Sequence, residues 1–283
     1  MWLTFGTVLR GLPRVMAPIV RDQGDSWQVV AQPDHGDVCG DIALAWGNDR
    51  FEAPRARESL AIAARRHDDG WAIWERTPDV DRRDGRPLNV FDVGTEVHLA
   101  FYRAMIAAVA DEDPYAGVLA SMHGAGLYSG RYGTQPSFKM TFQDTWRDQV
   151  DAFTRERNDA HDARAAELGI SDEQRWVDYK LLQVADRLCL YLCLNDLVAG
   201  AEDDLAPVPM DYDGEETTLA IRPVGPWQIS LAPYPFAQPE LALTLRRRVL
   251  PKRRWASRRE FAAAYDAAAV EDRVIEVRDG DAA

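Results

Sequence analysis

The sequence predicts a mainly α-helical fold with a small antiparallel β appendage formed by its N- and C-terminal segments. Two observations predict this class. Apolar residues recur at helical spacing through most of residues 33–200, and short runs rich in β-branched residues lie on either side of that stretch. We therefore divide the chain of 283 residues into an N-terminal extension with a hairpin (1–32), a helical core (33–200) and a β-rich segment packed on that core (201–283).

The elements are expected in the following order. Two short strands lie within residues 17–32, joined by the turn signal Gln23-Gly24-Asp25. Helices follow at about 34–46, 54 to 67 or 69, 94–110, 114–123, 138–168 and 173–199. The charged stretch 74–91 is expected to be an ordered loop and the glycine-rich stretch 124–137 a flexible connection. After the acidic loop AEDDLAP, the runs TLAIRPV, WQISLAP and LALTLRRRVL predict an antiparallel sheet that has a place for the N-terminal hairpin.

The charge balance favours a small-molecule substrate. The chain has 33 basic and 46 acidic residues, a net charge of −13, which repels nucleic acids and anionic membranes. No apolar run approaches the ~20 residues of a membrane-spanning helix. Cys189 and Cys193, one helical turn apart, are poorly placed for a disulfide, so we expect buried thiols and a cytoplasmic protein. A homodimer is left open.

Four of the five histidines fall on separate expected helices, each on an apolar face. They are His35, His67, His98 and His123. Asp186 lies between Leu182 and Leu190, where a carboxylate costs several kcal/mol unless it meets a metal or another cation. Each residue alone could be a core histidine or a salt-bridged acid. Together with Asp68, they form the imidazole and carboxylate set that suits iron, manganese or zinc. The fifth histidine, His161, is expected to be exposed and inert.

The order of these residues resembles that of the HD-domain superfamily, which includes metal-dependent phosphohydrolases and a smaller group of di-iron oxygenases. The resemblance covers about residues 33–200 and implies two divalent or redox metal ions, iron or manganese. One ion would be held by His35, His67, Asp68 and Asp186, and the other by Asp68, His98 and His123. HD enzymes often have a lysine after the doublet as an anion contact, whereas this chain reads HDDGW. The phrases QPDH, HDDGW, SMHGAGLY and LLQVADRLCLYLC also look like an uncharacterised bacterial family.

A few other residues are candidates for catalysis or substrate binding. Asp68 and its neighbour Asp69 are candidate catalytic groups, Asp69 as a general base or as a group that orients a ligand. Trp71 is a candidate pocket wall. Arg131, Lys180 and Arg187 are candidate contacts for an anionic substrate, although solvated helix faces account for such residues equally well.

The sequence leaves three functions open. The first is a metal-dependent hydrolase, in particular a phosphohydrolase, which acts on a small anionic substrate through a dinuclear site. The second is a di-iron oxygenase that uses the same ligands. The third is a non-catalytic metal-binding or sensor protein. Metal analysis of the purified protein would separate these functions best.

Overall fold

The computed structural model describes residues 18–71 and 79–281 of the chain. Its helices are α1 (Gln32–Ala45), α2 (Arg57–Arg66), α3 (Thr95–Glu112), α4 (Pro114–Ser129), α5 (Arg147–Glu167), α6 (Asp172–Leu194) and α7 (Arg258–Ala267). Its strands are β1 (Ile19–Asp22), β2 (Ser26–Val30), β3 (Asp203–Pro209), β4 (Glu216–Gly225), β5 (Gln228–Ala232), β6 (Glu240–Pro251) and β7 (Val270–Asp279). Helix accounts for 47% and strand for 22%, so the fold is mixed α/β and the expectation of a mainly α protein is wrong.

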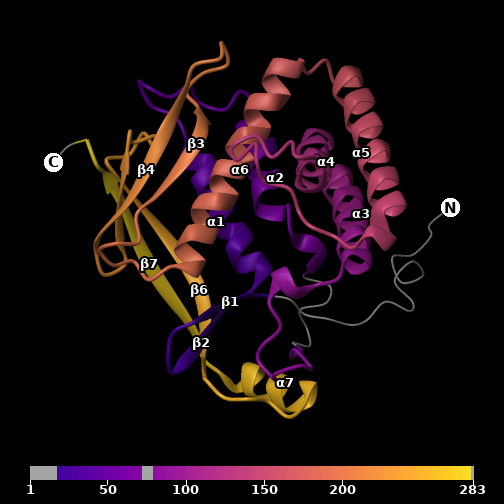
Figure 1. Cartoon of the computed structure of the whole chain (residues 1–283). Helices are drawn as coiled ribbons and strands as arrows, with labels where there is room; N and C mark the ends of the chain where they lie inside the picture. Colours follow the sequence, from indigo (N-terminus) through magenta and orange to yellow (C-terminus); the bar gives the residue numbers. More distant parts are fainter. Residues whose placement is uncertain (1–17, 72–78, 282–283) are drawn as a thin grey trace.

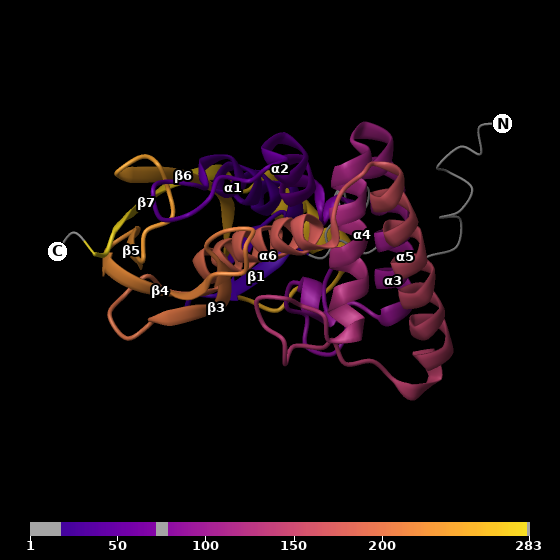
Figure 2. The same cartoon turned by 90° about the horizontal axis from the view of Figure 1, so that it is seen from above.

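All seven strands belong to one sheet, with the order β1-β2-β6-β7-β5-β4-β3. The N-terminal hairpin joins this sheet through antiparallel pairing of β2 with β6. Pairing of β5 with β7 is parallel, so the sheet is not the purely antiparallel one that we expected. Figure 1 shows the sheet on one side of the helices, and Figure 2 shows it curling partly around α1 and α6.

Two strands that the sequence did not indicate, β3 and β7, account for much of the difference. In β7, the buried Ile275 and Val277 stand among charged residues, which hid the strand pattern. These charges are matched across the sheet, since Arg247 of β6 lies 3.2 Å from Glu271. Strand β3 begins inside the expected acidic loop and buries Leu205 and Val208 against its neighbours. Strand β7 depends on pairing with β6 and β5, whereas β3 forms a hairpin with the following strand, β4.

One hydrophobic core extends from the helices into the sheet. It contains Ile42 of α1 and Leu188 of α6 together with Leu219, Ile229 and Leu243 of the sheet. Helices α1 and α6 lie between the sheet and the group formed by α3, α4 and α5 (Figure 1). Among the described residues, no helix combines the length and the apolar character that a membrane span requires.

The first part of the glycine-rich stretch expected to be a flexible connection, residues 124–129, is helical. Helix α4 continues through Gly124 and Gly126 and ends at Gly130, whose φ of 69° suits a glycine after a helix. A Cβ on Gly124 would lie 3.0 Å from the Tyr102 ring, and one on Gly126 would lie 1.9 Å from the Tyr179 hydroxyl. These glycines therefore allow close packing. Helix α5 is also shorter than expected, because it begins at Arg147 and not near residue 138.

Candidate metal centre

The six residues proposed as metal ligands come from five parts of the helical layer. They are His35 on α1, His67 and Asp68 at the end of α2, His98 on α3, His123 on α4 and Asp186 on α6. The four histidines are each at most 5% exposed, as their apolar helix faces predicted. That these residues bind metal stays a prediction, but the structure brings them together around one region.

Four of these side chains lie close together, linked through Asp186 and His67. The distance from Asp186 Oδ1 to His35 Nε2 is 3.2 Å and to His67 Nε2 is 3.5 Å. His67 Nε2 is 3.6 Å from Asp68 Oδ2. Two ligands at about 2.1 Å from a tetrahedral metal ion are separated by about 3.4 Å. These spacings are compatible with neighbouring ligands of one metal ion, and those of 3.5 and 3.6 Å are long for direct hydrogen bonds.

Neighbouring groups hold these ligands in orientation. His67 Nδ1 donates to the Ala64 carbonyl at 2.8 Å, which directs Nε2 toward the two carboxylates. The Tyr132 hydroxyl donates to Asp186 Oδ2 at 2.7 Å, and the Tyr102 hydroxyl donates to Asp68 Oδ1 at 2.9 Å. Each carboxylate thus keeps one oxygen on a tyrosine and turns the other toward the histidines.

The electrostatics of this group favour a bound cation. Burial lowers the pKa of His67, but the nearby Asp68 and Asp186 carboxylates outweigh burial and raise that pKa above its usual value. Burial raises the pKa of Asp186, but the facing His35 and His67 rings outweigh it and hold the pKa well below the usual range. The buried atom His67 Nε2 has no hydrogen-bond partner. A cation at this point would satisfy this nitrogen and both carboxylates.

His123 and His98 differ from this pair in their charge. Burial lowers the pKa of each to about 4, so both imidazoles are neutral at neutral pH. His123 lies beside His67, with 4.9 Å between ring centroids, and its buried Nδ1 has no hydrogen-bond partner. His98 Nδ1 is 2.5 Å from the Tyr128 hydroxyl. His67, Asp68 and His123 form one of the described groups that could hold a metal ion.

A cavity of about 200 Å³ opens onto this group. Four of the proposed ligands reach its wall: Asp68, His98, His123 and Asp186. The remaining wall is mainly apolar and aromatic, formed by residues such as Leu127, Phe138, Met140 and Leu190. Arg187 also lines the cavity and donates from Nη1 to the Thr134 carbonyl at 2.6 Å.

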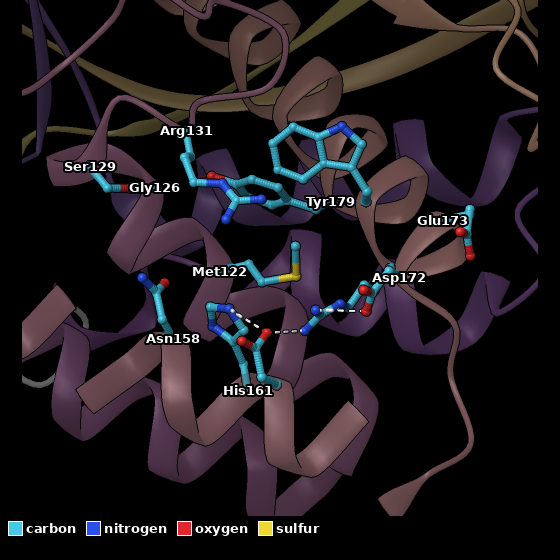
Figure 3. A pocket seen from close by; sticks show the side chains of 12 residues that line it. Met122, Gly126, Ser129, Arg131, Asn158, His161, Asp172, Glu173 and Tyr179 are labelled. Atoms are coloured by element: carbon cyan, nitrogen blue, oxygen red, sulfur yellow. Dashed lines mark hydrogen bonds and ion pairs between the residues drawn. The ribbon is translucent and has the colours of Figure 1, made fainter. Parts of the chain in front are cut away.

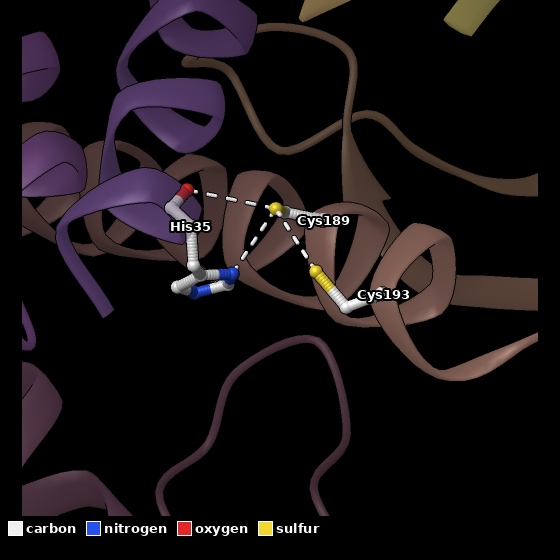
Figure 4. A group of neighbouring side chains, drawn as sticks. All are labelled: His35, Cys189 and Cys193. Atoms are coloured by element: carbon white, nitrogen blue, oxygen red, sulfur yellow. Dashed lines mark hydrogen bonds between the residues drawn. The ribbon is translucent and has the colours of Figure 1, made fainter. Parts of the chain in front are cut away.

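Three thiols lie near the His35 ring. Cys39, Cys189 and Cys193 are buried and free, as the sequence predicted. Figure 4 shows Cys189 between His35 and Cys193, with Sγ at 3.0 Å from His35 Nδ1. His35, Cys189 and Cys193 are a second group that could hold a metal, and His35, Cys39 and His67 are a third. Burial raises the pKa of Cys189 to about 12, so its thiol is protonated and orients the His35 ring.

Most of the other predicted site residues lie elsewhere. Asp69 pairs with Arg66 at 2.7 Å and does not line the cavity. Lys180 pairs with Glu216, and Arg131 lines a different cavity. Trp71 ends a 3-10 helix, but its side chain lies outside the described residues. His161 was expected to be exposed, yet it is only 8% exposed because α5 packs it against α4 and α6.

Sequence reasoning missed the tyrosines at this site. Tyr102 follows His98 by four residues on α3 and therefore shares its helix face, a spacing that could have revealed it. Tyr128 lies five residues after His123, and Tyr132 follows the end of α4. No local signal identified these two, because the glycines around them indicated a loop.

Residues 18–252 match a family described as a protein of unknown function, DUF3891. The chain belongs to the DUF3891 family. This match gives no support for the HD-domain superfamily, so that expectation is wrong, and the ligand order that suggested it is not specific to that superfamily. Against the curated proteins and the solved structures, no significant match was found.

Proposed function

We propose that this DUF3891 protein is a metal-dependent hydrolase that acts on a small molecule with an apolar body and one anionic group. The observation that carries the proposal is the shell formed by His35, His67, Asp68 and Asp186, with spacings of 3.2 to 3.6 Å, beside a cavity. Buried imidazole and carboxylate ligands around an open side are typical of catalytic metal sites.

A divalent cation in this shell would supply Lewis acidity and lower the pKa of a water molecule. The protein's own groups would orient the reactants. Asp68 lines the cavity and is held by Tyr102, so it is placed to accept a proton there. Asp69, the other catalytic candidate, is paired with Arg66 and cannot take that role from its present position. Burial and Asp68 keep the pKa of the Tyr102 hydroxyl well above its usual value, so it stays a hydrogen-bond donor.

The cavity wall favours a substrate with little charge. Arg187 is the one cationic side chain among the described residues of that wall. A single guanidinium suits one carboxylate or one phosphate monoester. The apolar side chains Phe138, Met140 and Leu190 would bury the rest of the molecule. A polyphosphate would require more cations than this wall provides.

We further propose that the site is dinuclear, with a second ion held by Asp68, His98 and His123. Both histidines line the cavity and are neutral, as metal ligands must be. With two iron ions, the same residues would suit an oxygenase, and the apolar cavity favours this second candidate because dioxygen chemistry needs a dry site. Iron and manganese suit both candidates.

Metal content and turnover test the proposal together. Protein loaded with Mn²⁺, Zn²⁺ or, without oxygen, Fe²⁺ would be assayed on aryl phosphates and aryl carboxylic esters, and on oxygen uptake with the iron form. We expect hydrolysis that depends on the ion and is lost in His67→Gln. If His98→Gln binds one equivalent of metal less than the wild type, the site holds a second ion. If His98→Gln keeps the full metal content, the site holds one ion. Stoichiometric metal with oxygen uptake but no hydrolysis would favour the oxygenase. An absence of bound metal in the wild type would refute both.

A further inference from the structure

A second cavity, of about 330 Å³, lies between α4, α5 and the start of α6 (Figure 3). None of its wall residues belongs to the wall of the metal cavity. The two cavities nevertheless lie on opposite faces of the same segments, since Met122 and Arg131 line this one while His123 and Tyr132 line the other. It is therefore a separate site that the proposed chemistry does not use.

Three buried polar atoms of residues that line this cavity have no hydrogen-bond partner. They are His161 Nδ1, Ser129 Oγ and the Tyr179 hydroxyl oxygen. His161 is 8% exposed, and burial lowers its pKa to about 4, so its ring is neutral. The tautomer that carries its proton on Nε2, which faces Asp162 Oδ1 at 3.6 Å, leaves Nδ1 as an acceptor. An unpaired buried acceptor costs stability, and a ligand with an N–H or O–H donor would remove that cost.

The charges at the cavity are divided between two ends. Arg131 makes no ion pair with a described residue and lies 5.2 Å from the centre of the Trp176 ring. At the His161 end, Arg175 bonds both Asp162 and Asp172, and Glu173 adds a further acid. Three acids thus stand against Arg175 and the nearby Arg157, which also acts on His161, so this end keeps a net negative charge. This end attracts a cation, whereas the Arg131 end attracts an anion.

The middle of the cavity is apolar. Met122 and the rings of Trp176 and Tyr179 contribute to its wall. In Figure 3, Arg131 and Tyr179 lie on one side of Met122, and His161 and Asp172 lie on the other. A molecule that reaches both charged ends would therefore lay a short hydrocarbon segment along Met122 and Trp176.

We propose that this cavity binds a small zwitterion, with its carboxylate on Arg131, its ammonium group on His161 Nδ1 and Asp162, and a methylene spacer between them. Each end of the ligand meets the opposite charge, and the ammonium group supplies the donor that His161 lacks. Its volume is at the lower end of the range for small-molecule sites, about 300 to 1,000 Å³. The ligand class is thus an amino acid with separated charges.

Three probes of equal length test the proposal by calorimetry on the full chain: 5-aminovalerate, pentanoate, which lacks the ammonium group, and pentylamine, which lacks the carboxylate. We expect 5-aminovalerate to bind at least about tenfold more tightly than either analogue. It should also shift the ring resonances of His161 in NMR spectra, identified by their loss in His161→Gln. Equal binding of the three probes, or no shift at His161, would overturn the proposal.

Arg131→Gln and Arg164→Gln form a matched pair of variants. Both arginines are exposed, so both variants should fold, but Arg164 pairs with Glu167 outside the cavity. We expect Arg131→Gln to weaken 5-aminovalerate binding at least about tenfold and Arg164→Gln to leave it unchanged. Equal affinities in the two variants would contradict the assigned orientation. Because neither residue contacts the metal centre, metal content should stay unchanged in both, which separates this outcome from the proposed hydrolase.

Discussion

The sharpest prediction concerns the stabilisation of the protein by metal and its loss in His67→Gln. His67 Nε2 faces both carboxylates of the shell and has no other partner, so its removal takes away a central ligand. A metal ion at about a hundredfold above its dissociation constant stabilises the folded chain by about 2.7 kcal/mol. For a chain of this size, each kcal/mol raises Tm by about 2 to 4 °C, which gives a shift of about 5 to 10 °C. If His67→Gln weakens binding by about a hundredfold, the same metal concentration contributes only about 0.4 kcal/mol, or roughly 1 °C.

The assay is thermal unfolding of chelator-treated protein with and without Mn²⁺, Zn²⁺ or Fe²⁺. Only the shift within each variant is compared, so a change in basal Tm does not matter. His161→Gln is the control, because His161 is also a buried histidine but lies outside the metal cavity. It should keep the full shift. A wild type that no cation stabilises, or a His67→Gln variant with the wild-type shift, would refute the assignment of this shell.

Three further predictions concern the same site. Burial lowers the pKa of His98 from 6.5 to about 4, so its neutral ring stabilises the folded state fully above pH 6.5. In urea titrations, the difference in free energy of unfolding between the wild type and His98→Gln should therefore shrink as the pH falls from 6.5 toward 4. A difference that does not change with pH would contradict a buried neutral ring. Tyr132→Phe removes the donor to Asp186 Oδ2 and should weaken metal binding by about 10- to 100-fold in a metal titration, whereas wild-type affinity would show that this hydrogen bond does not orient the ligand. Asp69→Asn should leave metal affinity unchanged, since Asp69 faces Arg66, and a marked loss would restore it as a site residue.

The grouping of the candidate ligands could be predicted because it depends on local helix geometry. A histidine three or four residues from apolar neighbours must face the core, and core-facing residues of packed helices must meet. His35, His67 and Asp186 follow this logic, since Asp186 Oδ1 lies within 3.5 Å of the Nε2 atoms of both rings. The family could not be predicted in this way, because the same order of ligands can arise in unrelated helical layers.

Local sequence patterns could not predict the full sheet or the second cavity. The residues of β7 carry charges on both sides of Ile275, and only the pairing with β6 and β5 makes this segment a strand. Gly126 indicated a loop, although its lack of a side chain makes room for Tyr179 inside the helix layer. His161 lay on a polar helix, and its burial follows from how α5 packs on α4 and α6 rather than from its neighbours in sequence.

The opposite pKa shifts of the four histidines indicate where charge belongs at the metal centre. His35 and His67 are buried, and burial lowers their pKa, but Cys189 and Asp186 at His35, and Asp68 and Asp186 at His67, outweigh burial and raise the pKa above the usual value. His98 and His123 are similarly buried, yet their pKa falls to about 4, because burial and a neighbouring histidine outweigh the nearby carboxylates. Positive charge is therefore favoured between the first two rings and the carboxylates, and disfavoured at the cavity wall. In the proposed centre, a first ion would bind between His35, His67 and the carboxylates, where it would replace protons and bind more weakly as the pH falls. A second ion at His98 and His123 would enter a neutral site beside a cation, so it should bind after the first and with lower affinity.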